Sequence, residues 1–138
     1  MLIDKENLLS LQQAITASAN STNTIDLGPN MWSGHSGSDE EIPIFATITE
    51  SFAAAGAATL EIIIESSNDV AFGSGVVQHN RSKAYAIAEL AVLGRLGHSM
   101  SIPPDVKRYL RARYVVTTGP FTAGKITLGV TASRQTNR

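Results

Sequence analysis

The sequence contains no cysteine, which excludes disulfide bonds, thiolate nucleophiles and cysteine-based zinc sites. Aromatic residues make up only 6% of the 138 residues, and there is a single tryptophan. The 12 acidic residues nearly balance the 11 lysines and arginines, so the formal net charge is −1. A chain with so little excess charge has no global field that would draw it to nucleic acid or to an anionic membrane. Any binding through charge must therefore be local.

Long apolar runs are also missing. The first ten residues, MLIDKENLLS, already include Asp4, Lys5 and Glu6. No stretch reaches the length of a membrane span or of a secretory hydrophobic segment, so we expect a protein made and kept in the cytoplasm, without a membrane partner. The length and the 43% hydrophobic content predict a single domain, residues 1–138, built around one core.

What the sequence does contain is alternation with a period of two, the pattern of β-strands. In the segment TLEIIIES, the side chains of Glu61 and Glu65 fall on the face opposite Leu60, Ile62 and Ile64, and we expect both carboxylates to face solvent. The alternation is clearest in four segments: PIFATITE (43–50), TLEIIIES (59–66), KRYLRARYVVTT (107–118) and KITLGVTAS (125–133).

Weaker strand candidates lie around and between these four. The segment KAYAIAEL also has the composition of a short helix. Eight or so short strands at this spacing predict an all-β protein, either a sandwich or a barrel. The weaker candidates are AITAS (14–18), TNTIDLG (22–28), SGVVQHN (74–80), KAYAIAEL (83–90) and HSMSI (98–102).

Two stretches share an outline of phenylalanine, small residues, glycine and Thr-Leu: SFAAAGAATL (51–60) and PFTAGKITL (120–128). The first resembles a helix in composition. Because each stretch falls between two predicted strands, we interpret both as strand connections in which Phe52 or Phe121 folds back over the end of the core.

No group of residues predicts catalysis. The three histidines, His35, His79 and His98, are far apart in sequence and lack metal-ligand spacing, so we expect each at the surface or on an edge strand. The acidic run at residues 39–41 follows His35 but lacks the alternating ligands of a calcium loop, which favours a solvated loop over a metal site. Nucleophile-elbow and phosphate-loop motifs are absent. We therefore predict no catalytic, cofactor-binding or metal-binding residues and no enzymatic activity.

The concentrated cationic segment at residues 107–113 interleaves arginine with tyrosine. We expect Tyr109, Arg111 and Arg113 to contact another protein. A merely solvated strand face is the second interpretation, and nucleic-acid binding a distant third.

Two further regions supply interface candidates. Ahead of the first clear strand, the segment MLIDKENLLSLQQ carries Leu2, Ile3, Leu8 and Leu9. We expect an N-terminal arm or short helix over residues 1–12, which docks either on a neighbouring molecule or on its own sandwich. The aperiodic stretch at residues 28–42 contains Trp32, which either contacts a partner or anchors this long loop to the core.

Several long segments resemble the head cement, or decoration, proteins of tailed bacteriophages, a family of small jelly-roll proteins. The resemblance covers most of residues 1–27 and 43–132, and its specificity lies in the order of the segments. Those that carry it are TASANSTNTIDLG (16–28), ITESFAAAGAATLEIIIESSNDVAF (48–72) and IPPDVKRYLRARYVVTTGPFTAGKITLGV (102–130).

The resemblance implies a jelly-roll-like antiparallel β-sandwich with a long N-terminal segment and a long loop near residues 28–42. It implies a structural virion protein on the outer surface of the capsid, which bridges major capsid protein subunits and stabilises the shell against packaged DNA. Such proteins act as homo-oligomers, with a homodimer favoured here and a trimer as the alternative, and they use no cofactor and no direct contact with nucleic acid. Two other functions stay open: a carbohydrate-binding module using the Trp32 loop, and a jelly-roll enzyme with a histidine–carboxylate metal site.

Overall fold

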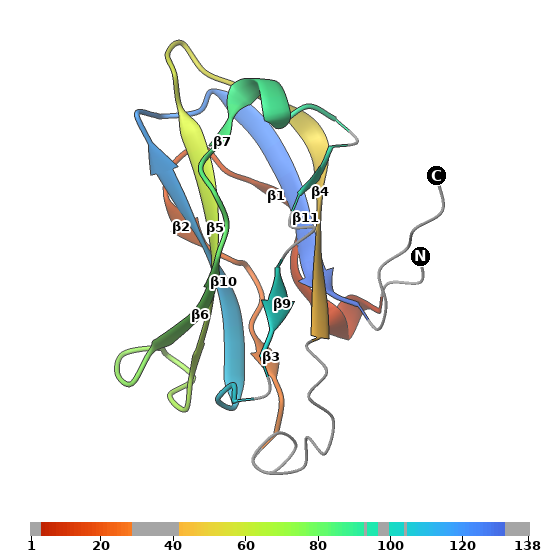
Figure 1. Ribbon diagram of the computed structural model, residues 1–138, viewed down its shortest axis with the longest axis vertical. Coiled ribbons are helices and arrows are strands. Elements are labelled where there is room, and N and C mark those ends of the chain that lie inside the picture. The colour runs from red at the N-terminus through yellow and green to blue at the C-terminus, as the bar shows by residue number, and fades with distance from the viewer. Residues whose placement is uncertain (1–3, 29–41, 93, 97–99, 104, 132–138) are drawn as a thin grey trace.

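The computed structural model describes residues 4–28, 42–92, 94–96, 100–103 and 105–131. Figure 1 shows two layers of strands facing each other, with β5, β6 and β10 on the left and β4 and β11 on the right. The elements are, in chain order, the 3-10 helix η1 (Lys5–Asn7), β1 (Leu8–Ala14), β2 (Ala19–Asn20), β3 (Ile25–Asp26), β4 (Ile42–Ala53), β5 (Thr59–Ser67), β6 (Val77–Arg81), β7 (Tyr85–Ala86), the 3-10 helix η2 (Ile87–Glu89), β8 (Arg95–Leu96), β9 (Ser101–Ile102), β10 (Tyr109–Thr117) and β11 (Ala123–Val130).

All strand pairs in the described part of the chain are antiparallel. One sheet has the order β1-β11-β4-β8, with β9 also on β4. The other has the order β2-β10-β5-β6, with β3 also on β10 and β7 also on β5. The first and last described strands in chain order, β1 and β11, are thus neighbours in the first sheet. The connections between β1 and β2, between β4 and β5, and between β10 and β11 cross from one sheet to the other, as in a jelly roll. The predicted all-β, jelly-roll-like sandwich is confirmed.

The four clearest strand predictions are also confirmed. Because side chains alternate between the two faces of a strand, every second residue enters the space between the sheets. The residues buried there from these four strands are Ile44, Ala46, Ile48, Leu60, Ile62, Ile64, Leu110, Ala112, Tyr114, Ile126 and Leu128. The weaker strand candidates are confirmed only in part. AITAS is strand only at Ala14, and KAYAIAEL contains a two-residue strand followed by a 3-10 helix.

One polar link crosses this apolar interior. Ser10 of β1 donates its hydroxyl proton to Gln13 Oε1 at 2.7 Å, so the Tyr114 hydroxyl donates to Ser10 Oγ, also at 2.7 Å. Burial raises the pKa of Tyr114 above its usual value. The bond joins β1 of one sheet to β10 of the other and gives the buried phenol its partner.

Of the predicted N-terminal arm or short helix over residues 1–12, the described part is a 3-10 helix at Lys5–Asn7 and strand from Leu8 onward. After the 3-10 helix, β1 begins at Leu8 and pairs with β11, with Leu8 opposite Gly129. The side chains of Leu8 and Leu9 are buried in this chain's own sandwich, which is the alternative that the sequence left open. Leu2 and Ile3 lie outside the described residues.

The two phenylalanine stretches meet in space. The rings of Phe52 and Phe121 are buried and pack edge to face, with centroids 4.9 Å apart and an interplanar angle of 75°. The predicted cap over the core is therefore made by both rings together. The boundary differs from the prediction, because β4 continues through Ala53 and Phe52 belongs to the strand rather than to the connection.

Gly124 is required by this packing. Its φ of +139° lies in a region that favours glycine, and a Cβ at this position would lie 2.4 Å from the ring of Phe52. We expect Gly124→Ala to lower the free energy of unfolding by roughly 2 to 4 kcal/mol, through overpacking and backbone strain. Urea unfolding measures the change.

Gly56 provides the matched control, because a Cβ there would meet no atom within 4 Å. Gly56→Ala is expected to change the unfolding free energy by no more than about 0.5 kcal/mol. Equal effects of the two substitutions would contradict the packing role of Gly124.

Candidate functional site

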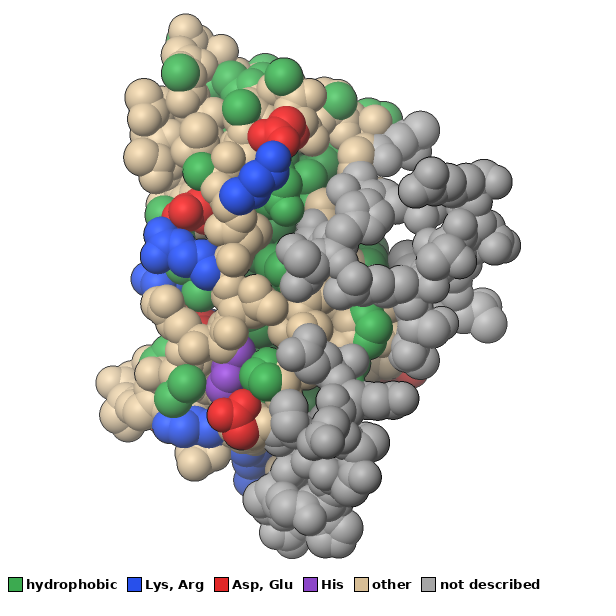
Figure 2. Space-filling model, viewed as in Figure 1, with side chains coloured by type: hydrophobic (Ala, Val, Ile, Leu, Met, Phe, Trp, Pro, Cys, Tyr) green, Lys and Arg blue, Asp and Glu red, His purple; other side chains and the backbone are tan. Residues whose placement is uncertain are grey.

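The outer face of the second sheet carries a cluster of charged side chains. Arg111 of β10 lies opposite Glu65 of β5, and Arg113 lies opposite Ile63, which in turn lies opposite Arg81 of β6. Because Ala112 and Tyr114 point into the core, the arginines between and beside them point outward. In Figure 2, basic and acidic side chains lie next to one another at several places on the molecule. We call Glu61, Glu65, Arg81, Arg111 and Arg113 the outer-face cluster.

Glu65 is the centre of this cluster and corrects a sequence prediction. Its side chain is only 3% exposed, although the alternation predicted a solvent-facing carboxylate. Arg111 Nε donates to Glu65 Oε1 at 2.6 Å, and Arg113 Nε lies 3.6 Å from Glu65 Oε2. The two long arginine side chains cover the carboxylate, which stays paired while it is removed from water. Glu61, nearer the other end of β5, pairs with Arg81 at 2.6 Å.

Arg111 is held from its other side as well. Its guanidinium carbon lies 4.1 Å from the centroid of the Phe72 ring, a cation–π contact. Phe72 follows β5 in a tight loop and has a φ of +53°. The loop is fixed by the Asp69 carboxylate, which accepts hydrogen bonds from the backbone N–H groups of Ala71 and Gly73 at 3.0 and 2.9 Å. Arg111 is therefore committed to contacts within its own chain.

The structure brings together three of the predicted interface residues. Tyr109, Arg111 and Arg113 lie on one face of β10 and are partly exposed. Trp32 lies outside the described residues. Docking on a neighbouring molecule would require Leu8 and Leu9 at the surface. Both side chains are instead buried in the core of this chain.

His79 of β6 belongs to a second cluster, with Ser66 of β5 and Asp105 of the segment before β10. Of the two predicted places, the surface or an edge strand, it occupies the second: His79 lies in the edge strand β6, and its side chain is 5% exposed. Nε2 lies 2.5 Å from Ser66 Oγ, which also accepts the backbone N–H of Lys107 at 3.0 Å. Nδ1 lies 4.0 Å from Asp105 Oδ1. His35 and His98 lie outside the described residues.

In space, Ser66 lies next to His79 and His79 next to Asp105, which is how the three residues of a catalytic triad are connected, but the geometry does not fit a triad. Ser66 is completely buried, so a substrate carbonyl cannot reach its Oγ. Asp105 is 82% exposed, and its Oδ1 is too far from Nδ1 for a hydrogen bond. What the cluster does is tie β5, β6 and the segment before β10 together. In the described ranges, no three or more histidine and acidic side chains form a possible metal site. The helices described there are two 3-10 helices of three residues each, so none could span a bilayer.

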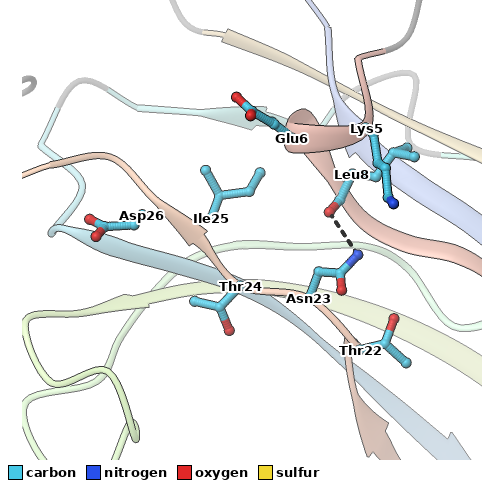
Figure 3. Close-up of a pocket in the computed structure, with 8 residues that line it drawn as sticks. All are labelled: Lys5, Glu6, Leu8, Thr22, Asn23, Thr24, Ile25 and Asp26. Carbon is cyan, nitrogen blue, oxygen red and sulfur yellow. Dashed lines mark hydrogen bonds between the residues drawn. The ribbon is translucent and has the colours of Figure 1, made fainter.

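An open pocket of about 700 Å³ lies between the first 3-10 helix and the segment that leads into β3. Figure 3 shows the Asn23 side chain directed at the Leu8 carbonyl, to which it donates at 3.4 Å, while Asp26 points away from these groups. The Arg108 guanidinium and the Gly28 N–H lower the pKa of Asp26 to about 2. No sequence motif indicated this pocket, whose lining residues are Lys5, Glu6, Leu8, Thr22, Asn23, Thr24, Ile25 and Asp26.

Removing the charge of Glu65 tests whether this carboxylate stabilises the outer-face cluster. Glu65→Gln leaves two adjacent guanidinium groups without a carboxylate, and we expect it to lower the free energy of unfolding by roughly 2 to 3 kcal/mol. Glu61→Gln is the matched control on the same strand, and its partner Arg81 is largely exposed, so only a small change is expected. Chemical denaturation of both variants measures the difference. A Glu65→Gln protein as stable as the Glu61→Gln protein would contradict the central role of Glu65.

The buried His79 predicts a pH dependence of stability. Burial, helped by nearby Lys107 and opposed by Asp105, holds the pKa of His79 below its usual value of 6.5. The unfolded chain therefore takes up this proton at a higher pH than the folded chain does. Stability from neutral His79 is complete above about pH 6.5 and is lost as the pH falls from there through the lower, folded-state pKa.

We expect wild-type protein to lose stability between pH 7.5 and pH 5.5, and His79→Gln, which has no proton to gain, to lose less. Urea unfolding at the two pH values gives the comparison. Equal losses in both proteins would show that His79 does not titrate over this range.

Comparison with curated proteins gives no match. A comparison with protein families gives a match to the family described as Bbp16, over residues 9–130. The matched region begins inside β1 and ends with the last residue of β11, so it contains both sheets of the sandwich. Since the match spans well over half of the chain, the protein belongs to the Bbp16 family.

Proposed function

We propose that this protein is a structural virion protein: a capsid cement, or decoration, protein of a tailed bacteriophage. In this role it binds the outer surface of the head, bridges neighbouring major capsid protein subunits and stabilises the shell against the pressure of packaged DNA. It acts without a cofactor and without catalysis, as a homo-oligomer, with a homodimer favoured.

The observation that carries the proposal is where the resemblance to head cement proteins falls in the fold. The longest resembling segment, residues 102–130, forms β10 and β11. β11 lies between β1 and β4 in one sheet, and β10 lies between β2 and β5 in the other. The likeness therefore concerns an inner strand of each sheet and the connection that crosses between the sheets, rather than a peripheral loop.

The physical character of the body supports the same role. A cement protein must keep its shape while many weak contacts, repeated by the symmetry of the shell, add up. Here the inner faces are packed with aliphatic side chains, and the outer face is interlocked by Arg111, Glu65 and Phe72. Such a body loses little conformational freedom on binding.

The carbohydrate-binding alternative depends on Trp32, which lies outside the described residues. The geometry therefore adds nothing in its favour. A glycan array probed with the protein tests it directly, since binding to a defined sugar would replace the cement proposal.

The cement proposal is tested by mixing the protein with phage heads that lack it. We expect the protein to sediment with these heads and to raise the temperature at which the shell melts. Heads that already carry their full complement of the protein are the control and should take up no more. A protein that neither sediments with bare heads nor raises their melting temperature does not have this function.

A further inference from the structure

We propose that Arg113 is the point at which the outer face of the second sheet receives a carboxylate from a partner protein. The inference rests on the proposed function, and it specifies the chemistry that the capsid protein must present: an aspartate or glutamate side chain placed over β10.

The evidence begins with how the arginines are paired. The structure describes the side chains of Arg81, Arg108, Arg111 and Arg113. Three of these have a carboxylate of their own: Arg81 with Glu61 at 2.6 Å, Arg108 with Asp26 at 2.8 Å and Arg111 with Glu65 at 2.6 Å. Within the described residues, Arg113 is the guanidinium without a carboxylate of its own.

In the described part of the chain, Arg113 lacks a carboxylate within hydrogen-bond distance of its Nε. It shares Glu65 with Arg111, but its Nε is 3.6 Å from Glu65 Oε2, too far for a hydrogen bond. That Nε is buried and has no hydrogen-bond partner among the residues that the structure describes. Two guanidinium groups thus face one carboxylate, which leaves one positive charge uncompensated at a fixed place on the sheet.

The same side chain is open to a partner. Arg113 is 39% exposed, twice the 19% of Arg111. Its β5 neighbour across the sheet is the buried Ile63, so an apolar side chain rather than water lies beside the charge on that side. A contact made there is partly screened from water, where an ion pair is stronger than on an open surface.

A carboxylate is the ligand that fits this site best. Because Nε is buried, the partner's carboxylate meets the two terminal Nη groups of the planar guanidinium, which donate two parallel hydrogen bonds, and the added negative charge balances the cluster. Nucleic acid, by contrast, requires several free cations along one surface, whereas three of the four arginines here are already neutralised.

The test compares Arg113→Gln with Arg81→Gln in binding to bare phage heads. Both substitutions remove one positive charge from the same sheet, so they alter long-range electrostatics to the same extent. We expect Arg113→Gln to weaken binding about tenfold or more, and Arg81→Gln to change it by less than about twofold. Arg113→Lys, which keeps the charge but not the planar fork, should bind with intermediate strength.

A stability measurement separates binding from folding. Arg113→Gln removes no hydrogen bond from Nε, and Glu65 keeps Arg111, so its melting temperature should stay close to that of the wild type. Arg111→Gln should melt at a clearly lower temperature, because it loses both Glu65 and Phe72. An Arg113→Gln protein destabilised as much as Arg111→Gln would assign Arg113 a structural role and overturn the inference.

The remaining outcomes distinguish failure of this inference from failure of the proposed cement function. If wild-type protein binds bare heads and Arg113→Gln binds equally well, the inference fails and the cement function stands. If wild-type protein does not bind heads at all, both fail. If wild-type protein binds a short DNA duplex and Arg113→Gln abolishes that binding, the ligand is a phosphate, which overturns the assignment of a carboxylate.

Discussion

Burial of the apolar faces between the two sheets is the constraint on which the rest of the structure depends. It fixes the register of every long strand, because a slip of one residue would turn Leu110 and Ala112 outward and bring Arg111 into the core. The same register that seals the core therefore places Arg111 and Arg113 side by side on the outer face, opposite β5. The charged surface and the hydrophobic core are two results of one alternation.

This dependence explains what could be predicted from the sequence. The long strands and the direction of their side chains follow from a local period of two. The contact between Phe52 and Phe121 was partly predictable, because both stretches fall at strand ends. The burial of Glu65 on the outer face of the sheet could not be predicted. Periodicity tells which face of a strand a side chain takes, but not whether side chains of neighbouring strands cover that face. Its partner Arg111 is 46 residues away in the chain.

The N-terminal strand and His79 show a second limit. β1 has register shifts on both sides of Ser10, and Gln12 has a φ of +46°, so Leu9 is buried while Leu11 is 55% exposed. A bulged strand breaks the alternation from which strands are recognised. The pairing of β5 with β6 is also irregular, between Ile64 and Glu65, next to the place where His79 turns inward. For the function, the residues alone predicted a cationic contact surface, and only the pairing pattern showed that Arg113 differs from its neighbours.

The pairing of β1 with β11 has a consequence for synthesis. Residues 8–14 pair with residues 125–129, which are synthesised much later, and the hydrogen bond between Ser10 and Tyr114 spans 104 residues. Neither contact can form until the later partner strand has left the ribosome. A translation product that stops before Ala123 leaves β1 unpaired and the interior open on that side. The first sheet is therefore completed only when β11 enters between β1 and β4, however early the other strands are made.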